Sequence, residues 1–130
     1  MTSIQLILQH DITLQRVQDL LVSAFEGGSG YWIDSATINA QPPVLDVKME
    51  GMKEETIYNV PVNKGGIIDI KVYDYDQPVE PLTLETIKAG LKIMAVKYPH
   101  HFKNFLEEND DAETADVFLQ CCILKDVIFG

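Results

Sequence analysis

Apolar positions recur at helical spacing in four stretches of the chain. Val17, Leu20, Leu21 and Phe25 fall on one face of a helix, which predicts a helix over residues 13–26. The same spacing predicts helices over 84–98, 100–108 and 112–125, and the last of these is apolar enough to be largely buried. Polar residues that can cap a helix stand at the start of three of the four. They are residue 11 or 13 for the first helix, residue 83 for the second, and residue 111 or 114 for the last.

Alternation of apolar and polar residues, together with β-branched and aromatic content, predicts strands elsewhere. We expect strands over 3–9, 31–40 and 67–75, a short and ambiguous one over 44–49, and a weak one over 56–62 that contains Pro61. Residues 51–55 are typical of a polar turn. Residues 63–66 also have turn composition, so residues 56–75 are expected to form a β-hairpin.

The order of these elements predicts the fold class. A strand, a helix, several strands and then helices favour a single α+β domain over residues 1–130, with an antiparallel sheet packed by an N-terminal helix and C-terminal helices. A length of 130 residues fits one domain. We expect residues 127–129 to end the chain as an extended segment docked on the core.

Charge and composition argue against several classes of function. The chain has 20 acidic and 10 basic side chains, a net charge of −10, and Arg16 is its only arginine, so direct binding to nucleic acid is not expected. No apolar run exceeds four residues and no secretory signal is visible, so we expect no membrane span. The two cysteines are sequence neighbours and cannot form a disulfide framework, which favours a cytoplasmic protein.

The acidic residues form two clusters that are candidates for an interaction surface. An acidic surface attracts a basic partner, although acidity also serves solubility alone. Pairs of carboxylates could bind a hard cation weakly, but neither cluster matches a calcium-binding loop. The candidate surface residues are Asp74, Asp76, Glu80, Glu107, Glu108, Asp110, Asp111 and Glu113.

A second candidate site combines an aromatic pair with a glycine turn. Tyr31 and Trp32 follow a glycine-rich stretch, where they could anchor an interface or stack on a ligand, and they could equally fill the core. Lys64, Gly65 and Gly66 could hold an anion on their backbone amides, but the turn joins two expected strands rather than preceding a helix, which favours a structural role.

Metal binding and nucleophilic catalysis are weakly supported. His100 and His101 are adjacent, as are Cys121 and Cys122, so their side chains diverge and no zinc-like spacing results. No nucleophile elbow is present, and the cysteines lie in an apolar helix that would keep their thiols neutral. We expect no metal and no cofactor.

Several short motifs occur in a characteristic order. A helix that opens at Thr13 runs into residues 26–28 (EGG) and then 31–32 (YW), followed by 65–66 (GG), 82–85 (LTLE) and 127–130 (VIFG). In these motifs the chain resembles small phage and prophage proteins of unassigned function. The resemblance carries no catalytic residues. It implies an accessory protein made in the cytoplasm of an infected bacterial cell.

Three functions follow as hypotheses. The first is a non-enzymatic accessory protein that binds and modulates a host protein with a basic surface, such as an anti-defence inhibitor. The second is a binding protein for a small molecule or signalling nucleotide, with a pocket near Trp32 and residues 64–66. The third is an uncharacterised hydrolase-like enzyme that uses histidines and carboxylates. We also expect a homo-oligomer, because the apolar C-terminal stripe and the aromatic pair exceed what a small domain always buries.

Overall fold

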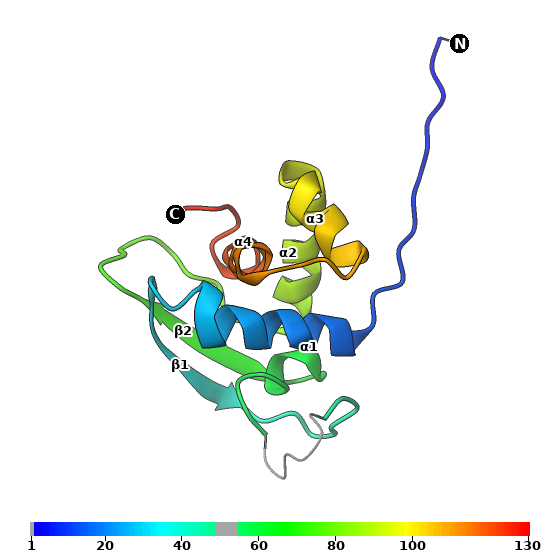
Figure 1. Cartoon of the computed structure of the whole chain (residues 1–130). Helices are drawn as coiled ribbons and strands as arrows, with labels where there is room; N and C mark the ends of the chain where they lie inside the picture. Colours follow the sequence, from blue (N-terminus) through cyan, green and yellow to red (C-terminus); the bar gives the residue numbers. More distant parts are fainter. Residues whose placement is uncertain (1, 49–54) are drawn as a thin grey trace.

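The computed structural model describes residues 2–48 and 55–130 (Figure 1). Its helices pack on a two-stranded antiparallel sheet, which confirms the α+β class. The elements in chain order are the α-helix α1 (Leu14–Ser23), the π-helix η1 (Ala24–Gly28), strand β1 (Ile33–Ala40), the 3-10 helix η2 (Val60–Val62), strand β2 (Ile67–Val72), and the α-helices α2 (Leu84–Lys97), α3 (Pro99–Leu106) and α4 (Ala112–Ile123).

The helix predicted over 13–26 is confirmed as α1 with its π-helical extension η1. The Thr13 hydroxyl accepts a hydrogen bond from the Arg16 amide at 3.2 Å and so caps the helix. At the other end, the Ser29 amide donates to the Ala24 carbonyl, five residues earlier, at 2.8 Å. Gly28 ends this turn against α4, where a Cβ would lie 2.3 Å from the Ala112 carbonyl oxygen.

The sheet consists of β1 and β2, which confirms the strands predicted over 31–40 and 67–75. Ile33 lies opposite Val72, and Ala40 lies opposite Ile67. On β2 the buried residues alternate with exposed ones, so one face of the strand packs on the helices and the other faces solvent. Leu82 adds a single antiparallel bridge to Ile68.

The predicted hairpin over 56–75 is wrong, because β2 pairs with β1 instead. Residues 56–62 form turns and the 3-10 helix η2 rather than a strand. Side chains replace the strand ladder: the Asn59 side chain accepts from the Thr56 amide, and the buried Asn63 side chain bonds to backbone groups of 46, 47 and 59. Pro61 fits the first turn of this short helix, where no amide donor is needed.

Two other predicted strands are also absent. Residues 2–10 are extended and exposed, and the strand predicted over 3–9 is wrong because no described strand lies beside it to complete a ladder. Residues 44–48 form bends without strand pairing. Met49 and residues 51–54 of the predicted turn lie outside the described residues.

The three predicted C-terminal helices are confirmed as α2, α3 and α4. Helix α4 lies at the centre of the domain, and every residue from Thr114 to Ile123 is buried. Helix α2 meets it at Gly90, where a Cβ would lie 2.5 Å from the Cys122 sulfur, so a glycine permits the close approach of the two helices.

The C-terminal segment docks on this core as expected. The Phe129 ring stacks on Trp32 with ring centroids 5.7 Å apart. The Gln120 side-chain oxygen accepts hydrogen bonds from the amides of Ile128 and Phe129 at 2.8 and 2.9 Å. Residues 127–129 are therefore fixed to α4 and to the start of β1.

Candidate functional site

The structure places seven of the eight candidate acids on the surface, in two groups. The first group surrounds the connection between α3 and α4, and we call its exposed members the corner acids: Glu107, Glu108, Asp111 and Glu113. The second group lies in the segment between β2 and α2, and we call its members the loop acids: Asp74, Asp76 and Glu80.

The corner acids are partly neutralised by basic side chains. Lys103 lies 4.0 Å from Glu107 and Arg16 lies 3.7 Å from Glu108, while the His101 ring, which adds a positive charge only when protonated, lies 3.9 Å from Glu113. Asp111 is occupied as the N-cap of α4, because its carboxylate accepts from the Thr114 amide at 2.9 Å. That hydrogen bond lowers the pKa of Asp111, which therefore stays charged at neutral pH.

Asp110 differs from the other candidate acids because it pairs with the only arginine. The Arg16 guanidinium lies 2.7 Å from the Asp110 carboxylate and also donates to the Phe105 carbonyl at 2.9 Å. The Asp110 side chain is 10% exposed. The pair ties α1 to the α3–α4 connection, so we assign Asp110 a structural role rather than one at the surface.

The loop acids have no basic partner in the part of the chain that the structure describes. Their segment passes the C-terminal end of α4, where the Glu80 amide donates to the Ile123 carbonyl at 2.8 Å. The corner acids flank the other end of the same helix. The twelve residues of α4, roughly 18 Å of helix, therefore lie between Glu80 and the corner acids.

The aromatic pair belongs to the core rather than to an open site. Trp32 is 2% exposed, and its indole nitrogen donates to the Asp116 carboxylate at 2.7 Å. Tyr31 is half exposed, but its hydroxyl donates to the other Asp116 oxygen at 2.6 Å. Burial and this hydrogen bond raise the pKa of Tyr31 to about 12.

Asp116 is the residue on which this network depends, and it was not among the candidate residues predicted from the sequence. Its carboxylate is buried and also accepts hydrogen bonds from the Ser29 hydroxyl at 2.9 Å and from the Gln120 side-chain nitrogen at 3.2 Å. A signal existed in the sequence, since Asp116 and Gln120 stand four residues apart on an otherwise apolar helix and so share one face.

The glycine turn lies far from the aromatic pair. Residues 64–66 precede β2 at the Ile67 end of the sheet, whereas Trp32 precedes β1 at the Val72 end. The Gly66 amide already donates to the Asn63 carbonyl, and a Cβ on Gly66 would lie 1.9 Å from the Val60 carbonyl oxygen. The two features therefore do not form one pocket, and the turn serves the packing of η2 against β2.

The histidines and cysteines are not arranged for catalysis. His101 bonds to the Thr114 hydroxyl at 3.0 Å, and His10 packs edge-on against Phe102. Burial raises the pKa of the Cys121 thiol to about 12 and that of Cys122 well above its usual value, so both thiols are neutral. Among residues 2–48 and 55–130, no group of three or more potential metal ligands lies close enough to bind a metal.

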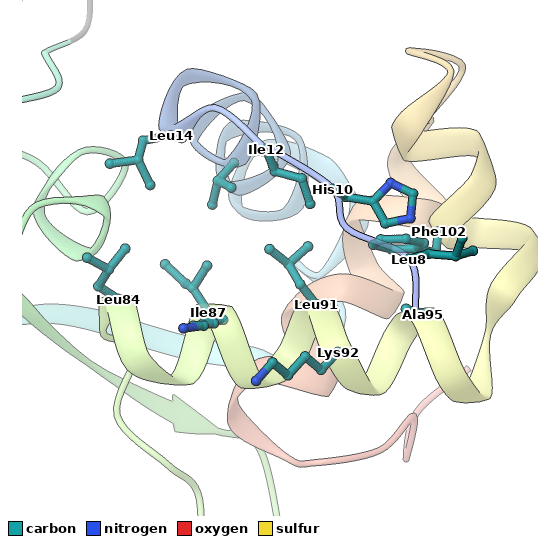
Figure 2. Close-up of a pocket in the computed structure, with 12 residues that line it drawn as sticks. Leu8, His10, Ile12, Leu14, Leu84, Ile87, Leu91, Lys92, Ala95 and Phe102 are labelled. Carbon is teal, nitrogen blue, oxygen red and sulfur yellow. The ribbon is translucent and has the colours of Figure 1, made fainter. Parts of the chain in front are cut away.

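One hollow in the described surface is predominantly apolar and is lined by residues that the sequence analysis did not connect. This apolar groove lies between α1 and α2 and has a volume of about 710 Å³. Figure 2 shows Ile12 and Leu14 on one side, and Leu84, Ile87 and Leu91 facing them from α2. Its remaining lining residues are Leu8, His10, Val17, Lys88, Lys92, Ala95 and Phe102.

No family model, curated protein or solved structure matches this chain. The resemblance to phage proteins therefore stays a prediction. No helix of the described chain is long and apolar enough to cross a membrane.

Proposed function

We propose that this protein is a non-enzymatic, phage-type accessory protein that binds a host protein through its acidic surfaces. The observation that carries the proposal is the arrangement of the charges. Seven carboxylates are exposed in two groups, one at the connection between α3 and α4 and one in the segment between β2 and α2, on a chain whose net charge is −10. Such a surface attracts a basic partner over long range and repels nucleic acid.

The buried carboxylates and thiols are engaged in structural roles, which supports binding over catalysis. Asp116 and Asp110 are held in hydrogen-bond networks, and both thiols are buried and neutral. Glu80 borders one surface hollow, beside Asp69, and Glu107 and Glu108 border another, beside Arg16. All three carboxylates stay exposed to solvent, whereas acid–base catalysis requires an environment that separates the pKa values of its carboxylates. A protein that inhibits by covering a basic surface needs none of that chemistry.

The loop acids are expected to contribute more than the corner acids. Each corner acid lies near a basic side chain or caps a helix, so binding a partner would replace interactions that already exist. The loop acids have no such counter-charge among the described residues. Lysines or arginines of a partner would therefore form the first ion pairs of these carboxylates.

The experiment is affinity capture from bacterial lysate at low salt, read by mass spectrometry, with three variants that each remove three charges. The loop variant carries Asp74→Asn, Asp76→Asn and Glu80→Gln. The corner variant carries Glu107→Gln, Glu108→Gln and Glu113→Gln. The control variant carries Asp34→Asn, Asp46→Asn and Asp69→Asn, at exposed acids outside both groups.

We expect one dominant host protein on the wild-type and control proteins, with less on the corner variant and least on the loop variant. Release of that protein as salt rises would support a charge-driven contact. A captured protein that all three variants retain equally would refute the acidic surfaces as the binding site.

A further inference from the structure

The N-terminal arm, residues 2–10, carries four of the ten large hydrophobic side chains that are exposed in the described part of the chain. Ile4, Leu6, Ile7 and Leu8 are each between 77% and 88% exposed. Figure 1 shows the arm running away from the body of the domain. A contiguous set of exposed apolar side chains on a monomer marks a site of contact with another molecule.

The pattern of the arm suits an extended segment laid on an apolar floor. In an extended chain Ile4, Leu6 and Leu8 point to one side, and Gln5, Ile7 and Gln9 point to the other, so the first side is wholly apolar. Residues 2–9 contain no ionisable side chain. The arm can therefore enter an apolar environment without the cost of desolvating a charge.

The apolar groove between α1 and α2 matches this segment in chemistry and in length. Its walls are mostly aliphatic, with the exposed Lys88 and Lys92 also lining it, and Phe102 and His10 close one end. From Leu84 to Ala95 the groove follows twelve residues of α2, or roughly 18 Å. The six residues 2–7 span roughly 20 Å when extended.

The arm is poorly suited to fill its own groove. Leu8 and His10 already line one end of it, so residues 2–7 would have to reverse direction to enter. Residues 7–10 are Ile, Leu, Gln and His, and none of them favours a tight turn. An arm from another molecule needs no reversal.

We propose that the apolar groove receives the N-terminal arm of a second copy of this chain, so that two copies exchange arms about a two-fold axis. Such an exchange fills both grooves and buries both arms with one symmetric contact. The apolar stripe of α4 and the aromatic pair, from which an oligomer was predicted, do not supply the interface, because α4 and Trp32 are buried within the chain. The arm supplies the interface instead.

Salt separates this contact from the proposed partner binding. Each copy carries a net charge of −10, so two copies repel one another, and the contact itself is apolar. Screening the repulsion strengthens the dimer as salt rises, whereas it weakens a charge-driven contact with a basic partner. Failure of one proposal therefore leaves the other intact.

The test is sedimentation equilibrium of the full chain, compared with Leu6→Asp and with the matched control Gln5→Asp. Both variants add one charge to an exposed arm, so neither threatens the fold, but only position 6 faces the groove floor. We expect a wild-type dimer that Leu6→Asp weakens by a factor on the order of a hundred, because each dimer loses two buried leucines. Gln5→Asp should weaken it by less than about tenfold.

A spin label distinguishes this dimer from any other. The spin label is attached at Thr2→Cys of a copy that carries no isotope label. This copy is mixed with an equal amount of isotope-labelled wild-type chain. The native cysteines are buried and stay unmodified. In NMR spectra we expect line broadening at the methyl groups of Leu14, Leu84 and Leu91 of the isotope-labelled wild-type copy. A monomer at high protein concentration would overturn the proposal, as would a dimer in which the isotope-labelled copy broadens only at residues outside the groove.

Discussion

Replacing Asp116 by alanine is expected to be among the most damaging single substitutions of a polar residue in this chain. The carboxylate is 8% exposed and accepts hydrogen bonds from Ser29, Tyr31, Trp32 and Gln120. Alanine would leave the Ser29 hydroxyl and the Trp32 indole nitrogen buried without an acceptor. The Tyr31 hydroxyl is partly exposed and regains a bond to water.

The magnitude follows from the two orphaned donors. Each buried donor left without a partner costs about 1–3 kcal/mol, so Asp116→Ala should lower the free energy of unfolding by about 2–6 kcal/mol. That is a large part of the roughly 5–15 kcal/mol typical of a native domain. Asp116→Asn retains an acceptor oxygen for Trp32 and Ser29, so it should cost only about 1–2 kcal/mol.

The assay is urea unfolding followed by circular dichroism and by the fluorescence of Trp32, the only tryptophan. Asp69→Asn serves as the control, because Asp69 is exposed on β2 and should change stability by less than about 0.5 kcal/mol. If Asp116→Ala cost no more than the control, or if alanine and asparagine cost the same, the account of this network would be wrong.

Three further outcomes are expected. Both amide atoms of Gln18 are buried without a hydrogen-bond partner in the described chain, so Gln18→Leu should raise the free energy of unfolding by about 1–2 kcal/mol in urea melts; a loss of stability would contradict this. The thiols of Cys121 and Cys122 should not react with a thiol reagent at pH 8 until the protein unfolds, because burial raises their pKa; rapid labelling of the native protein would count against the structure. The pKa of Tyr31 is raised in the folded state to about 12, so the contribution of Tyr31 to stability is complete below pH 10 and is lost as pH rises towards 12. Tyr31→Phe should remove this part of the alkaline loss of stability in thermal melts. A pH profile that Tyr31→Phe leaves unchanged would refute this prediction.

Much of the fold followed from local patterns in the sequence. The helices were predictable because their apolar positions repeat at 3.6 residues and because Thr13, Thr83 and Asp111 each accept a backbone hydrogen bond as a cap. The strands at 33–40 and 67–72 were predictable from their alternation. These features are determined by residues near one another in the chain.

The errors arose where distant residues decide the structure. Alternation at 3–9 indicates an extended segment, but a strand also needs a neighbour, and none of the described strands lies beside it. The partner of β2 is β1, across a long connection, rather than the nearer residues 56–62. Likewise, the bond between Arg16 and Asp110 joins residues 94 positions apart, which no spacing rule could reveal.

The candidate site was predictable only in part. Exposure of the corner and loop acids follows from their charge, because unpaired carboxylates are rarely buried. The roles of Asp110 and Asp116 were missed because charge alone does not say which carboxylates meet a donor in the core. The apolar groove was missed because α1, α2 and the N-terminal arm come together only in the folded chain.

The central claim is that exposed carboxylates bind a basic partner, and its most direct test is the salt dependence of the affinity. The dissociation constant for the captured host protein is measured from low salt to about 1 M, where charges are screened beyond about 3 Å, for the wild-type protein and the loop variant. We predict that the wild-type affinity falls steadily with salt and that the loop variant is weaker and less sensitive to salt. An affinity that is independent of salt and equal for the two proteins would contradict the account.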